Sequence, residues 1–151
     1  MSVTRLFGAI AAALAVLAIP VAASAKDPVY TGRFNNVAVE GHDPVAYFTE
    51  AMPVKGDDQY TYDYNGATWK FSSAENREAF VADPEKFAPQ FGGYCAWAVS
   101  QGYTARGNPN NWTIVDDKLY LNYNDSVQRK WEKDIPGFIA KATENWPEVL
   151  N

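Results

Sequence analysis

The sequence predicts a small mixed α+β fold, in which two β-hairpins form small antiparallel sheets that pack against short helices. Residues 59–71 and 112–123 predict the hairpins, because apolar and polar side chains alternate along them and each contains a turn sequence. Capping residues before short apolar segments predict the helices, including those at the C-terminus. Hydrophobic residues make up 47% of the 151-residue chain and aromatic residues 15%, which is enough apolar surface for a packed core.

The first 25 residues predict a secretory signal peptide of the general export pathway. One basic residue, Arg5, precedes the uncharged segment 6–21, and the small residues Ala23-Ser24-Ala25 follow. We expect cleavage after Ala25, so that residues 26–151 form a periplasmic or secreted protein. The alternative is an uncleaved membrane anchor, for which this segment is short and interrupted by Pro20. No later segment is long and apolar enough to span a bilayer, so we expect no membrane association after cleavage.

The first half of the mature chain predicts a strand, a helical turn and a hairpin, in this order. Residues 34–40 predict a short strand, with its two valines on one face. Asp43-Pro44 suits the first positions of a helical turn over residues 45–48, because Asp caps helices and Pro fits their first turn. In the hairpin that follows, Asn65-Gly66 is the preferred two-residue turn.

The second half predicts short helices around the second hairpin, which turns at residues 116–118. No repeat, low-complexity tract or linker interrupts the chain, so we expect one domain over residues 26–151. The helices are expected to begin at Ser72 (with Glu75 completing a capping box), at Asp83-Pro84 (ending near Phe87), close after Gly92-Gly93, at Asp125 (ending near Trp131) and at Pro136.

The composition excludes several classes of function. A formal net charge of −5 argues against binding to nucleic acid. A single cysteine, Cys95, excludes an intramolecular disulfide framework and any site built from several thiolates of one chain. A single histidine, His42, excludes centres built from several imidazoles.

Taken together, the predicted segments resemble the YHS domain family. The core of the resemblance covers residues 38–87. The rest of the chain, residues 88–151, is an extension that resembles a subfamily of exported YHS-domain proteins. The matching segments are Asp43-Pro44-Val45, residues 64–71 of the hairpin, Ser72-Ser73, Phe80 and residues 83–87, followed in the extension by residues 92–98 and 119–124.

The resemblance to the family does not extend to the cysteines of its metal-binding members. Metal-associated YHS domains carry cysteines at three positions, which in this chain are Ala46, Ser72 and Asn76, and none of these is a soft ligand. The thiolate site of that branch is therefore absent. Some relatives in the exported subfamily resemble this chain but carry selenocysteine at the position of Cys95, which implies chemistry at this residue.

The residues themselves give Cys95 two interpretations. It follows Gly92-Gly93 and is expected in the first turn of a helix, where the N-terminus lowers the pKa of a thiol. The alternative is a small buried side chain without chemistry, as free cysteines often are. His42, in the turn before Asp43, could act as a base or share a metal with Cys95, or it could have no functional partner. Such a pair would suit a transient copper ion, whereas tetrahedral zinc needs more ligands.

Aromatic side chains are the remaining candidates for a binding site. Tyr94 and Trp97 flank Cys95, and Tyr47 belongs to the predicted helical turn after Asp43. These side chains could line a pocket for an apolar or planar ligand, or they could build the core of a small domain.

Three functions therefore remain open. The first is a small binding or accessory module that holds a metal ion or small ligand near Cys95. The second is a redox protein that uses Cys95 as the nucleophile and an external thiol as its partner. The third is a structural or interaction protein of the cell envelope in which Cys95 is buried.

Overall fold

A computed structural model describes residues 25–151 of the chain. The predicted signal peptide, residues 1–25, falls almost entirely outside this range. The elements in chain order are η1 (Val39–Gly41), α1 (Ala46–Thr49), β1 (Asp57–Tyr64), β2 (Ala67–Phe71), α2 (Ala74–Ala82), α3 (Pro84–Phe87), η2 (Gln90–Gly93), α4 (Ala96–Ser100), β3 (Asn108–Val115), β4 (Lys118–Asn122), α5 (Asp125–Trp131), α6 (Ile135–Asn145) and η3 (Glu148–Leu150), where η marks a 3₁₀ turn.

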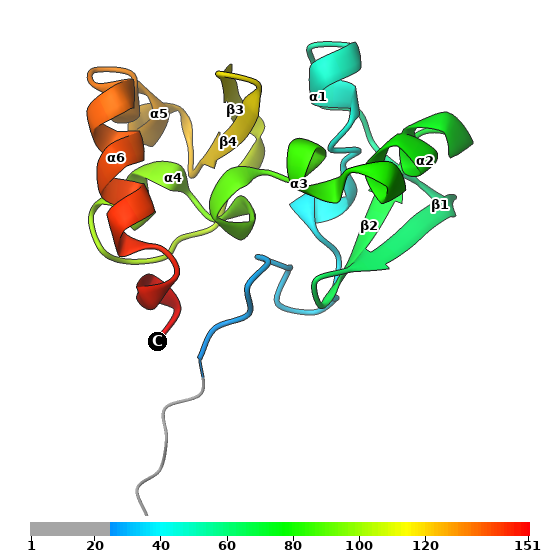
Figure 1. The fold of residues 1–151 in the computed structure, drawn as a ribbon, viewed down its shortest axis with the longest axis horizontal. Helices are drawn as coiled ribbons and strands as arrows, with labels where there is room; N and C mark the ends of the chain where they lie inside the picture. Colours follow the sequence, from blue (N-terminus) through cyan, green and yellow to red (C-terminus); the bar gives the residue numbers. More distant parts are fainter. Residues whose placement is uncertain (1–24) are drawn as a thin grey trace, which may run out of the picture.

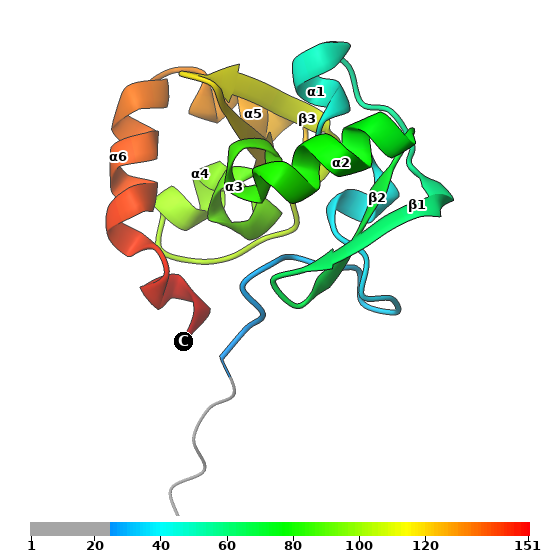
Figure 2. The same ribbon diagram turned by 45° about the vertical axis from the view of Figure 1, so that its right-hand side comes forward.

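The predicted α+β class is confirmed. Strands β1 and β2 form one two-stranded antiparallel sheet, and β3 and β4 form another. Figure 1 shows β1 and β2 beside α1, α2 and α3 in one half of the molecule, with β3 and β4 beside α4, α5 and α6 in the other. In Figure 2, α6 lies on the outer side of its half, away from β1 and β2.

Both hairpin turns follow from local backbone preferences. Asn65 and Gly66 join β1 to β2 with φ of 49° and 81°, the left-handed conformations that a type I′ turn requires. Asp116 and Asp117 join β3 to β4 with φ of 50° and 60°. Asp tolerates this region better than most residues, because its short side chain interacts with the local backbone.

The strand predicted over residues 34–40 is wrong. Val37 makes only an isolated parallel bridge with Thr68, and the chain then turns through η1. Val39 and Glu40 adopt positive φ values of 52° and 50°, so the backbone cannot continue as an extended strand.

Two helix starts are displaced by one residue from their predicted positions. Ser73, and not Ser72, caps α2, because its Oγ accepts a hydrogen bond from the N–H of Asn76 over 3.1 Å. Asn124, and not Asp125, caps α5 through the N–H of Val127 over 2.9 Å. The predicted turn at Asp83-Pro84 is confirmed as α3.

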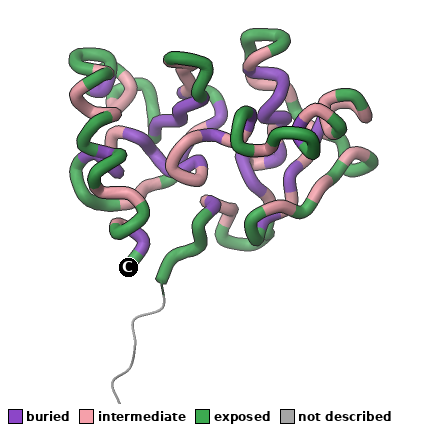
Figure 3. Tube along the Cα trace, in the orientation of Figure 1, coloured by how far each residue is buried: buried purple, intermediate pink, exposed green. Residues whose placement is uncertain are grey.

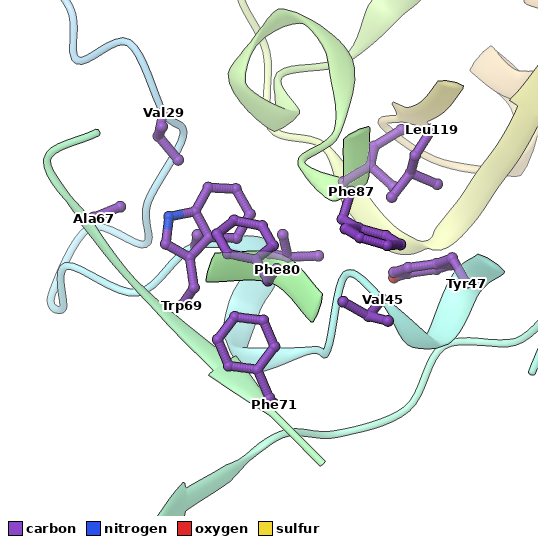
Figure 4. Packing of buried hydrophobic residues seen from close by; sticks show 12 residues of the cluster. Val29, Val45, Tyr47, Ala67, Trp69, Phe71, Phe80, Phe87 and Leu119 are labelled. Atoms are coloured by element: carbon purple, nitrogen blue, oxygen red, sulfur yellow. The ribbon is translucent and has the colours of Figure 1, made fainter. Parts of the chain in front are cut away.

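One hydrophobic cluster joins the two halves. Phe80 of α2 packs on Trp69 and Phe71 of β2, with ring centroids 4.9 Å and 5.1 Å away. Leu119 of β4 belongs to the same cluster, and Figure 4 shows it beside Phe87 and near Tyr47. The second hairpin therefore completes the core of the first, and Figure 3 shows the buried residues running through the interior of both halves.

The segment before η1 ties the ends of the described chain together. The N–H of Lys26 donates to the carbonyl of Leu150 over 2.7 Å, and the N–H of Tyr30 donates to the carbonyl of Gly92 over 2.8 Å. Within residues 25–151, no helix combines the length and the apolar character needed to cross a bilayer.

Candidate functional site

Cys95 lies where η2 gives way to α4. Its N–H donates to the carbonyl of Ala105 over 2.9 Å, and it makes an isolated parallel bridge with Leu121 of β4. Its carbonyl accepts from the N–H of Val99, which begins the helix. The residue is fully buried, with 0% of its surface exposed. The prediction that Cys95 lies at the start of a helix is therefore confirmed.

The predicted effect on the thiol is wrong in direction. Burial raises the pKa of Cys95, and hydrogen bonding by the backbones of Ala98, Tyr123 and Trp97 only partly opposes this effect. Helix α4 has five residues and therefore a short run of aligned peptide dipoles. Burial away from solvent has the larger effect on the pKa of Cys95, so the side chain is a neutral thiol at pH 7.

Asn122 fixes both the thiol and the start of α4. Its Oδ1 accepts from the Sγ of Cys95 over 3.5 Å and from the N–H of Trp97 over 3.1 Å. Only 1% of Asn122 is exposed, and its Nδ2 is a buried donor that has no partner among the described residues. An unsatisfied amide group thus lies beside the thiol, although sequence reasoning gave Asn122 no role.

A cavity of about 540 Å³ opens beside Cys95. Loop residues Tyr103 and Tyr123 are 48% and 45% exposed, which is unusual for large side chains in this structure. The rings of Trp97 and Tyr103 meet edge to face, with centroids 6.4 Å apart. The residues that line the cavity come from the N-cap and first turns of α4, the two loops that follow α4 and β4, and α5: Cys95, Trp97, Ala98, Tyr103, Ala105, Tyr123, Asn124, Val127 and Lys130.

Of the three aromatic candidates from the sequence, only Trp97 lines this cavity. Tyr94 precedes Cys95 on extended backbone, so the two side chains point to opposite sides. The hydroxyl of Tyr94 donates to the carbonyl of Asp27 over 2.8 Å, and its ring packs near Trp146.

Tyr47 belongs to the hydrophobic core and is not among the residues that line the cavity. Its hydroxyl donates to the carbonyl of Pro109 over 2.7 Å, and its ring lies 5.3 Å from that of Trp112. Burial raises the pKa of this phenol, with a smaller effect from Glu40. Tyr47 therefore joins α1 to β3 as a packing residue.

His42 also makes its contacts away from the cavity beside Cys95. Its Nδ1 lies 3.1 Å from the carbonyl of Val39, and its backbone bridges to Lys55. Partial burial and the charge of Lys55 lower the pKa of the imidazole, so it is neutral at pH 7. His42 does not line the cavity beside Cys95, and no group of three or more His, Cys, Asp or Glu residues within positions 25–151 is arranged to hold a metal ion.

A buried carboxylate occupies the region where the family resemblance implies metal-binding thiols. Asp43 is 0% exposed, and its Oδ2 accepts from the N–H of Ser72 over 2.8 Å, from the Oγ of Ser72 over 2.7 Å and from the Nδ2 of Asn76 over 2.7 Å. Its Oδ1 accepts from the N–H of Val45 over 2.9 Å.

Two of the three implied thiol positions, Ser72 and Asn76, therefore donate to one carboxylate. The third, Ala46, is buried and has no polar side chain. Oxygen and amide groups that satisfy one another do not fit a soft metal ion. Sequence reasoning assigned Asp43 only a role as a helix cap and missed this cluster, because its partners lie 29 and 33 positions away.

A second cavity, of about 460 Å³, lies beneath the segment that precedes η1. Its walls include Trp69 of β2, Phe91 of η2 and Trp146 after α6. It contains neither Cys95 nor His42. We therefore centre the candidate site on the Cys95 cavity, which is lined by the thiol and by the exposed aromatic rings of Tyr103 and Tyr123.

Comparison with known proteins finds one family match, which covers part of the chain. The model of the YHS domain matches residues 45–91, which run from the residue before α1 into η2. No curated protein and no solved structure matches the chain. The matched segment contains Ser72 and Asn76 and ends before Cys95. The resemblance seen in the sequence is thus confirmed at the level of the family for residues 45–91, and the chain contains a YHS domain there.

Proposed function

We propose that this YHS-domain protein is a small binding or accessory module that holds a small organic molecule in the cavity beside Cys95. The observation that carries the proposal is a cavity of about 540 Å³ whose aromatic walls, Tyr103 and Tyr123, remain about half exposed. Small-molecule sites commonly span about 300–1,000 Å³ and combine apolar walls with a few polar groups.

The lining of the cavity supports an organic ligand. Trp97, Tyr103 and Val127 supply apolar surface, and the thiol of Cys95, which donates its hydrogen to the Oδ1 of Asn122, adds a small polarisable group. Beside the thiol, the Nδ2 of Asn122 is a buried donor without a partner in the described part of the chain. Asn122 is not among the residues that line the cavity, so this side chain positions the thiol and is not a contact for a ligand.

The alternative of a metal ion at Cys95 and His42 has less support. Metal binding requires a thiolate, whereas burial favours the protonated thiol of Cys95. The described contacts of His42 are with Val39 and Lys55, so a shared ion would have to displace them. A transient copper or zinc ion would therefore need rearrangement of this region.

The redox alternative has one favourable feature. Hydrogen bonding by the backbones of Trp97, Ala98 and Tyr123 favours a negative charge on the sulfur of Cys95, although burial has the larger effect. A nucleophile needs its thiolate form, so this alternative requires a conformation in which the sulfur is better solvated. The structural alternative requires instead that no ligand enters the cavity.

We further propose that the protein acts in the periplasm or outside the cell after cleavage following Ala25. The apolar segment 6–21 and its small-residue end support export, as does the resemblance of residues 92–98 and 119–124 to the exported subfamily. Amino-terminal sequencing of protein isolated from the periplasmic fraction tests this. A mature chain that begins at Lys26 is the expected result, and retention of residues 1–25 would contradict it.

Ligand-observed NMR with a library of small aromatic fragments tests the binding function. We expect saturation transfer to fragments from the wild-type protein and its loss in Ala105→Phe, since the added ring occupies the cavity. Ala140→Phe, on an exposed position of α6, is the control and should behave as wild type. Fragment signals that persist unchanged in Ala105→Phe, or no signals with the wild type, would overturn the proposal.

A further inference from the structure

The residues that line the Cys95 cavity carry positive charge and no negative charge. Lys130 of α5 is the only residue lining it that carries a formal charge, although the whole chain has a net charge of −5. The cavity is therefore a local site of positive charge on an acidic protein. A ligand with a negative group would gain from Lys130 without facing a carboxylate in the lining.

Lys130 is available to a ligand. Its Nζ lies 5.1 Å from the centre of the Trp97 ring, so the ammonium group stands over an aromatic wall of the cavity. The ion pairs found within residues 25–151 join Lys70 to Asp58 and Arg106 to Glu40, so Lys130 is not neutralised by a carboxylate in this range.

The walls favour a flat molecule. Trp97, Tyr103 and Tyr123 present three aromatic side chains to the cavity, and aromatic rings pack best against other rings in offset or edge-to-face contact. The ammonium group of Lys130 over the Trp97 wall complements an anionic group carried by such a ring.

We infer that the cavity takes a flat aromatic molecule with one negatively charged group, whose ring packs against Trp97 and whose anionic group pairs with Lys130. This inference rests on the proposed binding function and specifies its ligand class. No covalent step at Cys95 is involved.

A matched pair of probes tests the charge preference. 2-Naphthoate and 2-naphthamide have nearly the same shape, but only the carboxylate is charged at pH 7. Affinities are measured by titration of the protein backbone and indole NMR signals at low salt. We expect 2-naphthoate to bind about threefold to fivefold more tightly than 2-naphthamide, the factor typical of one partly exposed ion pair.

Three lysine variants locate the effect. Lys130→Gln should remove the preference for the carboxylate, and Lys130→Arg should keep it, since the charge remains. Lys133→Gln is the control, because Lys133 is exposed, follows α5 and does not line the cavity. It should leave the ratio of affinities unchanged, which separates pairing at Lys130 from the net charge of the protein.

The outcomes separate the inference from the function on which it rests. If both probes shift the Trp97 signals with equal affinity, the binding function stands and the charge preference is overturned. If Lys130→Gln keeps the preference, the pairing with Lys130 is wrong. If neither probe shifts these signals and the fragment experiment is also negative, the binding function itself fails.

Discussion

The Sγ of Cys95 and the Oδ1 of Asn122 lie 3.5 Å apart in the interior, and this contact explains how the chain holds a single thiol. Asn122 also accepts from the N–H of Trp97, so one side chain positions the sulfur and the first turn of α4 together. Cys95 is therefore held by the second hairpin, which lies beyond the YHS match.

The first prediction concerns the reactivity of Cys95. Because burial raises the pKa of this thiol, alkylation by iodoacetamide in the folded protein should be slower at pH 7 than for a peptide thiol. Its rate should still rise above pH ~8.5, near the pKa of an unperturbed cysteine. The control is the same reaction in the unfolded protein. A rate that levels off below that pH would instead favour the redox alternative.

The same shift predicts a pH dependence of stability. The folded-state pKa of Cys95 lies above the unfolded value, so its contribution is fully present below pH ~8.5 and is lost as the pH rises through the folded pKa. Urea denaturation from pH 7 to 10 should show a steeper loss of stability for wild type than for Cys95→Ala. All other side chains are the same in the two proteins, so the difference between them isolates the thiol. Identical slopes would contradict the prediction.

Asp43→Asn tests the buried carboxylate. Asp43 accepts from Ser72 and Asn76, and an amide nitrogen in place of one oxygen would face donors with another donor. We expect a loss of at least about 2 kcal/mol in the free energy of unfolding, measured by urea denaturation. Asp58→Asn is the control, because Asp58 is 86% exposed and should cost less than about 1 kcal/mol. Equal effects of the two changes would show that the cluster contributes no special stability.

Local signals predicted both hairpins and the positions of the helices, but not the turn at residues 39–41, and contacts between distant residues determine the site. Asn65-Gly66 specifies its turn through its own backbone preferences, so the hairpin was predictable. Ser72 also looks like a helix cap when only its neighbours are considered. In the folded chain its hydroxyl donates to Asp43, 29 positions away, and Ser73 caps the helix instead.

The candidate site was only partly predictable for the same reason. Cys95 stood out as the single thiol, and its position before a helix follows from the neighbouring sequence. Its burial depends on Asn122, 27 positions away, and this contact leaves no local pattern. Tyr94 illustrates the opposite error: adjacency in sequence suggested a shared site, but alternation along extended backbone directs it away from Cys95.

Leu119→Ala tests whether the second hairpin completes the core of the YHS segment. Leu119 is fully buried in the cluster that contains Phe80 and Phe87, so its truncation should cost about 2–5 kcal/mol. Val81→Ala, at a position that is 45% exposed, is the control and should cost much less. Tryptophan fluorescence and far-UV circular dichroism should report one coincident unfolding transition in Leu119→Ala. Separate transitions for the two probes would show that the halves unfold independently.

A pair of glycine substitutions tests how the segment before η1 is held. Gly92 and Gly102 both have positive φ, of 61° and 87°, so alanine is strained by about 1 kcal/mol at either position. A Cβ at Gly92 would also overlap the carbonyl of Pro28, whereas a Cβ at Gly102 would meet no atom within 4 Å. Gly92→Ala should therefore destabilise the protein more than Gly102→Ala in urea denaturation. It should also speed hydrogen exchange at the N–H of Tyr30, which donates to the carbonyl of Gly92. If both substitutions lower the free energy of unfolding equally and hydrogen exchange at Tyr30 is unchanged, the close approach of this segment to η2 does not persist in solution.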